Sequence, residues 1–356
     1  MTVTEISNVV KQTAHEAGFE LAGIAPVRDF PEQQRFPQWI EAGHAGEMKY
    51  LEARDDSNRL KRASLNSVAP WAKSVVVCAI NYNTAHPYST QVQDSDRGWI
   101  SRYAWSREDY HDAVLRRLKN VESTLRGLAP GVETRSYVDT GPIIERIYAK
   151  YAGVGWIGKN TCILNQKMGS WLFLGVILTS LELTPDIPAP DRCGTCTRCI
   201  DACPTDALIA PYQLDSNRCI SYLTIEKRGP IPEQMREGMG RHIFGCDICQ
   251  DVCPWNRKAP CTGAAEFQAR EGFVNPALIW LTEITPEEFR EQFRGSAIRR
   301  TKRAGLRRNA VIAMGNSGDL QFLPALEELA HDEDEIVAEH ARWAMEKLKS
   351  LQEAGI

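Results

Sequence analysis

Four cysteines at short, fixed intervals constrain this chain more than any other sequence feature. Residues 193–204 read CGTCTRCIDACP, so cysteines recur after two, two and three residues, and a proline follows the last one. Thiolates at this spacing are typical of [4Fe–4S] sites, in which three cysteines of a run bind one cluster and the fourth binds another. The run therefore predicts two iron–sulfur clusters.

A second, altered run supplies the remaining ligands. Residues 246–254 read CDICQDVCP with the same intervals of two and three, but Ile243 stands three residues before Cys246. Cys219 lies between the two runs and can replace the missing ligand. We therefore predict that cluster 1 is bound by Cys193, Cys196, Cys199 and Cys253, and cluster 2 by Cys203, Cys219, Cys246 and Cys249.

Two structural zinc sites are the alternative, because cysteine pairs two residues apart also suit tetrahedral Zn²⁺. A structural zinc site requires neither a third cysteine at the same interval nor a proline after the fourth, so the spacing favours clusters. Cys78 lies in an apolar run and is expected in the core, while Cys162 and Cys261 have no assigned role.

Composition is that of a globular protein. The chain has 356 residues, of which 43% are hydrophobic and 25% charged, enough for two or three domains. Its first residues show no export signal, and no apolar run reaches the ~18–20 residues that span a bilayer. We expect a cytoplasmic monomer without membrane contact, whose eleven cysteines are redox or metal ligands. The net charge of −4 restricts any nucleic-acid binding to a local patch.

Periodicity divides the chain into three parts. Residues 1–185 alternate helical and strand patterns, with continuous apolar strands near 74–80 and 171–178, and predict an α/β domain. A Pro-rich linker leads into a predicted ferredoxin-like two-cluster domain with its connection, 186–294. Residues 295–356 are helical, and AVIAM at 310–314 returns as ARWAM 31 residues later. This repeat predicts HEAT-like helical units, with a plain three-helix cap as the alternative.

Residues 153–158 match G-x-G-x-x-G, but the surrounding elements are in the wrong order for a dinucleotide site. That motif needs a strand before it and a helix after it, whereas here a helical pattern comes first and strand-like residues follow. We interpret the glycines either as a plain turn or as backbone that approaches a ligand closely. In the second case the ligand contacts would be Gly155, Trp156, Gly158, Lys159 and Asn160.

Asp139 ends a predicted strand directly before Thr-Gly-Pro. Loops at the ends of strands commonly carry functional residues, so Asp139 is a candidate catalytic acid. The alternative is that Asp139 caps the helix that begins near Pro142.

A basic tract at 299–308 carries six positive charges and no acid. Most charge runs are solvated faces, but this density suits phosphate contacts of a nucleic acid. The predicted contacts are Arg299, Arg300, Lys302, Arg303, Arg307 and Arg308.

Together these features resemble the epoxyqueuosine reductase family. The resemblance covers nearly the whole chain and includes WAKS at 71–74, VDTGP at 138–142, GWIGKNT at 155–161 and CPTDAL at 203–208. It implies that the first domain binds cobalamin without a histidine ligand to cobalt. This agrees with the sequence, in which the nearest match to the D-x-H-x-x-G signature, at Asp109 and His111, lacks the glycine. The resemblance also implies that Asp139 is the catalytic acid.

The implied reaction removes the epoxide oxygen of epoxyqueuosine at the wobble position of tRNA and gives an alkene and water. Electrons would pass from an external one-electron donor, such as flavodoxin or ferredoxin, through the clusters to cobalamin. The alternatives are a reductive dehalogenase and a ferredoxin-like electron carrier. Dehalogenases of this kind are typically exported and need no basic helical tail, and a carrier needs no 185-residue domain before its clusters.

Overall fold

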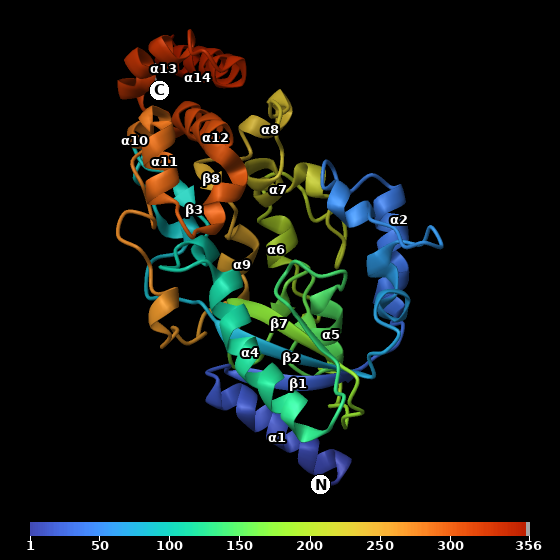
Figure 1. The fold of residues 1–356 in the computed structure, drawn as a ribbon. Coiled ribbons are helices and arrows are strands. Elements are labelled where there is room, and N and C mark those ends of the chain that lie inside the picture. The colour runs from blue at the N-terminus through green and yellow to red at the C-terminus, as the bar shows by residue number, and fades with distance from the viewer. Residues whose placement is uncertain (354–356) are drawn as a thin grey trace.

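The computed structural model describes residues 1–353, and one half of it is a sheet with helices on both faces (Figure 1). Its strands, in spatial order, are β1 (Leu21–Pro26), β2 (Ser74–Asn81), β7 (Leu172–Thr179) and β4 (Thr134–Tyr137). Every pairing in this sheet is antiparallel. The expected α/β domain is therefore right in its layers but wrong in its pairing, because α/β in the strict sense means a mostly parallel sheet.

Strand β2 is buried at every residue because helices cover both of its faces. α1 (Val3–Glu16) and α4 (Tyr110–Leu128) pack on the face that carries Val76, Cys78 and Ile80. α5 (Glu145–Tyr151) packs on the opposite face. The continuous apolar run thus reflects a central strand between two helical layers. Cys78 lies in the core as expected, and burial raises the pKa of its thiol to about 12.

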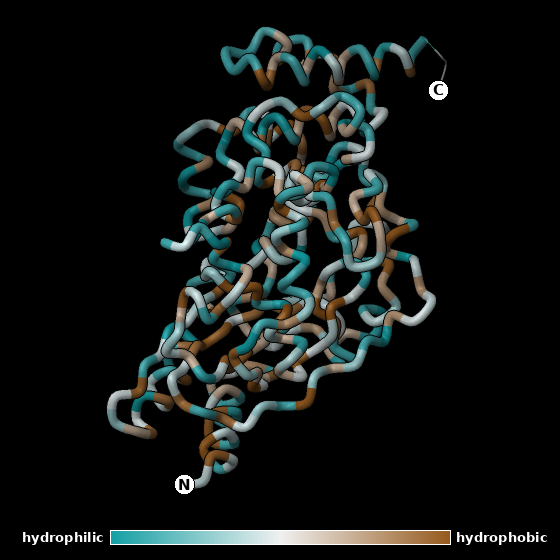
Figure 2. Tube along the Cα trace, turned by 90° about the vertical axis from the view of Figure 1, so that its right-hand side faces the viewer, coloured by the Kyte–Doolittle hydropathy of each residue, from teal (hydrophilic) through white to brown (hydrophobic). Residues whose placement is uncertain are grey.

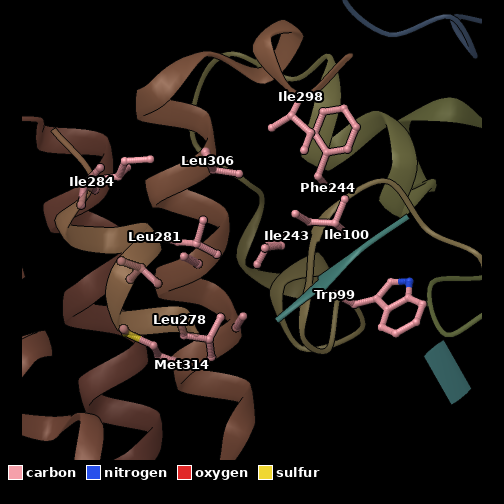
Figure 3. Packing of buried hydrophobic residues seen from close by; sticks show 14 of the residues in the cluster. Trp99, Ile100, Ile243, Phe244, Leu278, Leu281, Ile284, Ile298, Leu306 and Met314 are labelled. Carbon is pink, nitrogen blue, oxygen red and sulfur yellow. The ribbon is translucent and has the colours of Figure 1, made fainter. Parts of the chain in front are cut away.

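The chain leaves this domain between β2 and α4 and enters a second core. β3 (Trp99–Ile100) pairs in parallel with β8 (His242–Phe244), about 140 residues further along. Figure 3 shows Trp99 and Ile100 beside Ile243, Phe244 and the C-terminal helices. The predicted boundaries near 185 and 294 stay predictions, and this core crosses both of them.

Short elements carry the cysteine runs between the sheet and the C-terminal helices (Figure 1). They are α6 (Arg198–Asp201), α7 (Ile220–Ile225), α8 (Glu233–Arg236) and α9 (Ile248–Asp251). A small hairpin, β5 (Trp156–Ile157) and β6 (Ile163–Leu164), belongs to the glycine loop. The remaining short helices of the first domain are α2 (Arg35–Glu41) and α3 (Leu65–Val68).

The C-terminal part is built around one buried helix. The helices are α10 (Leu278–Glu283), α11 (Pro286–Gln292), α12 (Lys302–Ser317), α13 (Leu323–Leu329) and α14 (Glu335–Glu353). α12 is buried at every residue from 306 to 315, since α10, β8 and α14 surround it. In Figure 2 the outer helices alternate hydrophilic and hydrophobic colours, as expected for helices that bury one face. The repeated AVIAM and ARWAM segments lie in α12 and α14, which pack together, and the HEAT-like description stays a prediction.

Among residues 1–353, no helix is both long and apolar enough to cross a membrane.

His340 in α14 predicts acid sensitivity of the C-terminal part. Its ring is buried between the Ile231 N–H, which donates to Nε2, and the Ile336 carbonyl. Burial lowers the pKa of His340 to about 4. The unfolded chain binds a proton below pH ~6.5 and the folded chain only below ~4, so stability falls as pH falls through this window. Lowering the pH from ~7.5 to ~5.5 should reduce the free energy of unfolding by about 1 kcal/mol through this histidine.

Urea unfolding of wild type and His340→Leu at these two pH values tests this. The variant is less stable overall, because the Ile231 N–H loses its acceptor, but its stability should depend less on pH. His331→Leu is the matched control, because His331 is an exposed histidine in the same region. Equal pH dependence in wild type and His340→Leu would contradict the prediction.

Candidate functional site

The predicted ligands of cluster 1 surround one cavity. This cavity has a volume of about 240 Å³ and is lined by Cys193, Cys196, Cys199 and Cys253. Arg192, Arg198 and Trp255 also line it, and the two arginines are exposed. Three of the cysteines come from the first run and Cys253 from the second, as the spacing predicts.

The predicted ligands of cluster 2 also come together. Cys219 and Cys246 pack on the same apolar cluster as Ile220, Met239 and Ile248. Burial raises the pKa of the Cys246 thiol, and the neighbouring Cys219 and Cys203 raise it further. Cys249 lies close to Cys246 and Cys219 as well. Cys219 thus stands where the altered second run needs a ligand.

The two runs fold alike. The third cysteine of the first run, Cys199, lies in the one-turn helix α6, and Cys249 takes the matching position in α9. The two helices are in contact. At the position that matches Cys193, Ile243 is fully buried in β8. The position that would complete the second run is therefore occupied by a core residue, and Cys219 at the start of α7 is the predicted replacement ligand.

The site suits clusters better than zinc. Within residues 1–353, no three His, Cys, Asp or Glu side chains converge on a point where one ion could sit. A structural zinc ion needs four ligands at about 2.0–2.3 Å from a single centre. A cubane needs no such convergence, since each thiolate binds a different iron atom. Burial raises the pKa of Cys253 and of Cys199 to about 11, so metal binding must displace protons from these thiols.

The glycine loop holds both cysteine runs. Lys159 is buried, and its ammonium donates to the carbonyl oxygens of Gly194 (2.7 Å) and Cys196 (2.9 Å). The amide of Asn160 donates to the carbonyl of Cys249 (3.3 Å). Lys159 therefore braces the cluster 1 loop, and Asn160 braces the cluster 2 loop.

The atoms that lie closest to the glycines of this loop belong to the chain itself. A Cβ on Gly155 would lie 2.4 Å from the Leu164 carbonyl oxygen, and one on Gly158 would lie 2.3 Å from the Leu164 side chain. Trp156 is buried and packs edge-on against Trp255, with ring centroids 5.1 Å apart. The plain-turn interpretation therefore explains the glycines, and direct cofactor contacts of residues 155–160 stay a prediction.

Asp139 is exposed and sits in a left-handed backbone conformation, with φ of +58°. The Tyr110 hydroxyl donates to its carboxylate (3.0 Å). Its own backbone N–H donates to the Glu145 carboxylate (2.8 Å). α5 begins at Glu145 after Ile144, without a side-chain cap. The capping alternative is therefore wrong, and the carboxylate of Asp139 is free to act on a ligand.

Two ionisable side chains near Asp139, Glu145 and Tyr103, have raised pKa values, which favours their uncharged forms. Burial and the adjacent Asp139 carboxylate raise the pKa of Glu145 well above its usual range. Burial also raises the pKa of Tyr103, and the charges of Asp139 and Asp247 raise it further. Tyr103 packs against Tyr110 and against Phe244, with ring centroids 5.9 Å apart in each pair, so it lies between the Asp139 loop and the loop of Cys246. This places Asp139 on the cluster 2 side of the molecule.

The structure corrects the basic tract at two positions. Arg307 is buried and pairs with Asp332, and its Nε donates to the Thr282 carbonyl. Arg308 is fully buried and donates to the carbonyls of Lys227, Gly229 and Leu223. Both face inward because α12 is a core helix. The prediction that Arg307 and Arg308 contact phosphate is therefore wrong for this conformation.

The other four basic residues remain near the surface. Arg299 and Lys302 are exposed, and Arg303 is half-buried with its Nε bound to the Ile284 carbonyl. Arg300 pairs with Glu226 and is half-exposed. Phosphate contacts of these four stay a prediction.

Three further residues belong to the site but were not singled out from the sequence. Tyr110 and Glu145 hold Asp139, and Cys162 lies close to Cys249. No spacing pattern marks Tyr110 or Glu145, because their roles depend on where α4 and α5 begin relative to Asp139. Cys162 could have been noticed from the sequence, because it directly follows the glycine loop.

A four-cysteine pocket beside a second cysteine group, with an exposed acid near the latter, defines a two-cluster iron–sulfur oxidoreductase. A family model described as 4Fe-4S double cluster binding domain matches residues 192–256. A second, described as epoxyqueuosine reductase QueG, DUF1730, matches residues 62–140.

Similar proteins match over most of the chain. Epoxyqueuosine reductase of Synechocystis sp. is 44% identical over 81% of this chain and 98% of its own length. That of Vibrio cholerae is 39% identical over 98% of this chain and 93% of its own length. A solved epoxyqueuosine reductase with an epoxyqueuosine-modified tRNA-Tyr stem loop has a TM-score of 0.88 and 31% identity, and the match covers 98% of this chain and 91% of that one.

A structure from Bacillus subtilis, with its catalytic aspartate loop swung out of the active site, has a TM-score of 0.87 and 30% identity. It also covers 98% of this chain and 91% of that one. The chain belongs to the epoxyqueuosine reductase family and is an oxidoreductase with two [4Fe–4S] clusters. A dehalogenase and a simple electron carrier are therefore set aside.

Cluster ligation by Cys219 predicts a selective loss of iron. Anaerobically prepared wild type should contain about eight irons per chain, and Cys219→Ala about four, because only cluster 2 loses a ligand. Iron analysis and the spectra of the reduced clusters measure this. Cys261→Ala is the matched control, since Cys261 is exposed and lies in neither group, and it should keep about eight. A full complement of iron in Cys219→Ala would refute the ligand set.

Lys159 predicts a shift in one cluster potential. Its positive charge near cluster 1 favours the reduced, more negative cluster. A unit charge at about 7 Å contributes about 2 kcal/mol at an effective dielectric constant of ~20. Lys159→Met should therefore lower the potential of cluster 1 by roughly 40–90 mV, with ~59 mV for each factor of ten in a one-electron couple. A redox titration followed by electron paramagnetic resonance measures both clusters. Equal shifts in both clusters, or none, would contradict a local effect.

Proposed function

We propose that the protein reduces epoxyqueuosine to queuosine at the wobble position of tRNA. The observation that carries this proposal is the position of Asp139, an exposed carboxylate on the cluster 2 side, held by Tyr110 and Glu145. Conversion of an epoxide to an alkene and water takes two electrons and two protons. A proton donor close to a low-potential redox chain meets that need.

The residues between Asp139 and cluster 2 suit a further redox group, which we propose is cobalamin. Contacts run from Asp139 to Glu145 at the start of α5, and its neighbour Arg146 donates to the Thr161 carbonyl (2.6 Å). Cys162 follows and lies close to Cys249, a predicted ligand of cluster 2. Loop 158–162, Tyr103 and Tyr110 would therefore border the cofactor. When bound, cobalamin supplies a strongly reducing cobalt centre.

Proton transfer is the task of the Asp139 carboxyl group. A substrate and cofactor that cover Asp139 would exclude bulk water from the site, so a positioned side chain must supply the proton. The Tyr110 hydroxyl fixes the carboxylate orientation, and Glu145 fixes the backbone on which it stands. Asp139 then donates its proton to the oxygen that leaves the epoxide.

Electrons enter from outside the protein, and cluster 1 is the suited entry point. Its cavity is bordered by the exposed residues Arg192, Arg198 and Pro254. Two exposed arginines suit a negatively charged one-electron donor, such as flavodoxin or ferredoxin. Cluster 2 lies closer to Asp139 and would be the last relay before the substrate side.

The RNA would lie across the surface that carries Arg299, Arg300, Lys302 and Arg303, with its phosphates on these side chains. The wobble base must leave the loop stack to reach Asp139, as unpaired RNA bases commonly do in complexes with proteins. We expect a monomer to suffice and the reaction to occur in the cytoplasm, where tRNA is modified.

The test is an assay of the reconstituted protein with epoxyqueuosine-containing tRNA and a reductant, followed by nucleoside analysis. Wild type should form queuosine. Asp139→Asn should lower kcat by ~10²–10⁴, the usual contribution of a positioned general acid, while cobalamin and tRNA binding survive. The asparagine can still accept the Tyr110 hydrogen bond, so the loop should keep its place.

Asp112→Asn is the matched control, an exposed aspartate on the same helix as Tyr110, and it should turn over like wild type. Near-normal turnover of Asp139→Asn would place the proton donor elsewhere. Absence of queuosine with wild type would refute the proposed function itself.

A further inference from the structure

Tyr50 is a large aromatic side chain that the fold leaves uncovered. It lies in a single turn of 3-10 helix (Lys49–Glu52), on the segment between α2 and β2. Its relative exposure is 47%, whereas none of the other tyrosines in residues 1–185 is exposed. No part of the proton or electron path described above uses it.

Two guanidinium groups lie over the Tyr50 ring. The Arg300 Cζ is 5.3 Å from the ring centroid, and the Arg62 Cζ is 5.8 Å from it. Both are within the range of cation–π attraction. Arg62 also donates to the Tyr50 carbonyl (3.0 Å), and Arg300 is fixed by Glu226. Segments about 240 residues apart in the chain thus form one aromatic and cationic surface.

This surface borders the Asp139 site. Burial of its inner part raises the pKa of Tyr50, and the carboxylates of Glu226 and Asp139 raise it further. Arg62 lies close enough to Glu145 to act on its pKa. Thr301, next to Arg300, donates its hydroxyl to the Thr224 carbonyl, and the Thr224 hydroxyl accepts from the Gly245 N–H beside Tyr103. The ring and both guanidinium groups therefore lie on the side of the molecule that carries Asp139.

We propose that Tyr50, together with Arg62 and Arg300, is a stacking site for an unpaired base of the RNA loop. The proposal rests on the proposed function and names the contact that holds a loop base while its neighbour enters the site. Unpaired bases stack on aromatic rings and on guanidinium planes, and every base has a face that can do so. A phosphate beside the base would meet the two positive charges.

The competing explanation is a purely structural contact, in which Arg62 and Arg300 fasten the first domain to the C-terminal part through Tyr50. A fastening contact needs no exposed ring, and the hydrogen bond from Arg62 to the Tyr50 carbonyl would hold without any side chain at position 50. The half-exposed ring is unexplained by fastening and is what stacking requires.

The experiment measures binding of a tRNA anticodon stem–loop to the full-length protein with both clusters loaded. The probe carries 2-aminopurine at one loop position at a time, because its fluorescence is quenched by stacking. Tyr50→Phe should bind like wild type, since the ring remains. Tyr50→Leu and Tyr50→Ala should weaken binding by about 5- to 100-fold, and Tyr50→Ala should lose the quench at one loop position.

Salt dependence separates stacking from charge. Tyr50→Ala should keep the wild-type slope of affinity against salt concentration, whereas Arg300→Gln should reduce it by about 0.7. Arg290→Gln is the matched control, because Arg290 is exposed and pairs with Glu287 on α11. It should change neither the affinity nor the slope.

Four outcomes would overturn the proposal. They are wild-type affinity in Tyr50→Ala, equal loss in Tyr50→Phe, full retention in Tyr50→Leu, and an affinity loss that only follows a lower melting temperature. If wild type forms queuosine while Tyr50→Ala binds and turns over equally well, this inference fails and the proposed function stands. If wild type forms no queuosine, the proposed function fails first.

Discussion

The approach of two cysteine runs to one another around two predicted cluster sites is the constraint on which the rest of this structure depends. The cysteine runs lie on helices of one or two turns, which are too short to be stable alone. Each predicted cluster takes ligands from both runs, so the iron joins segments that have only small apolar clusters between them. In such a region the free energy of metal binding is in large part folding free energy. The glycine loop connects the cluster region to the first domain, because Lys159 and Asn160 donate hydrogen bonds to the backbone of the two cluster loops.

The site combines a rigid redox part with a loop that is held by few contacts. Asp139 stands in a left-handed conformation that is uncommon for aspartate, and two hydrogen bonds hold it there, one to the side chain and one to the backbone. A half-buried carboxyl group with a raised pKa, Glu145, makes the backbone contact. The loop can therefore be released by breaking two bonds, without disturbing the clusters.

The parts of this molecule that follow local rules could be predicted from the sequence. Cysteine spacing alone grouped the eight residues that the structure brings together, and even Cys219 followed from the one missing position. The apolar strands and the amphipathic helices were predicted for the same reason. Arg307 and Arg308 could not be, because the same charge pattern fits an exposed helix and a core helix whose arginines bind carbonyls. The antiparallel pairing and the contacts of Asp139 also depend on residues distant in sequence.

The parallel pairing of β3 with β8 has a consequence for synthesis on the ribosome. Trp99, Ile100 and Trp105 emerge early, but β8 follows about 140 residues later, and the helices α10 to α14 that complete their burial follow later still. At roughly 5–20 residues per second, the nascent chain exposes these side chains for about 7–30 s. Cys253 emerges at the end of the same interval, so cluster 1 cannot be completed earlier. The pairing of β3 with β8 and the insertion of cluster 1 therefore become possible at nearly the same moment. Until then the half-made protein offers both an apolar surface and unligated thiols to the chaperones and iron–sulfur carriers of the cell.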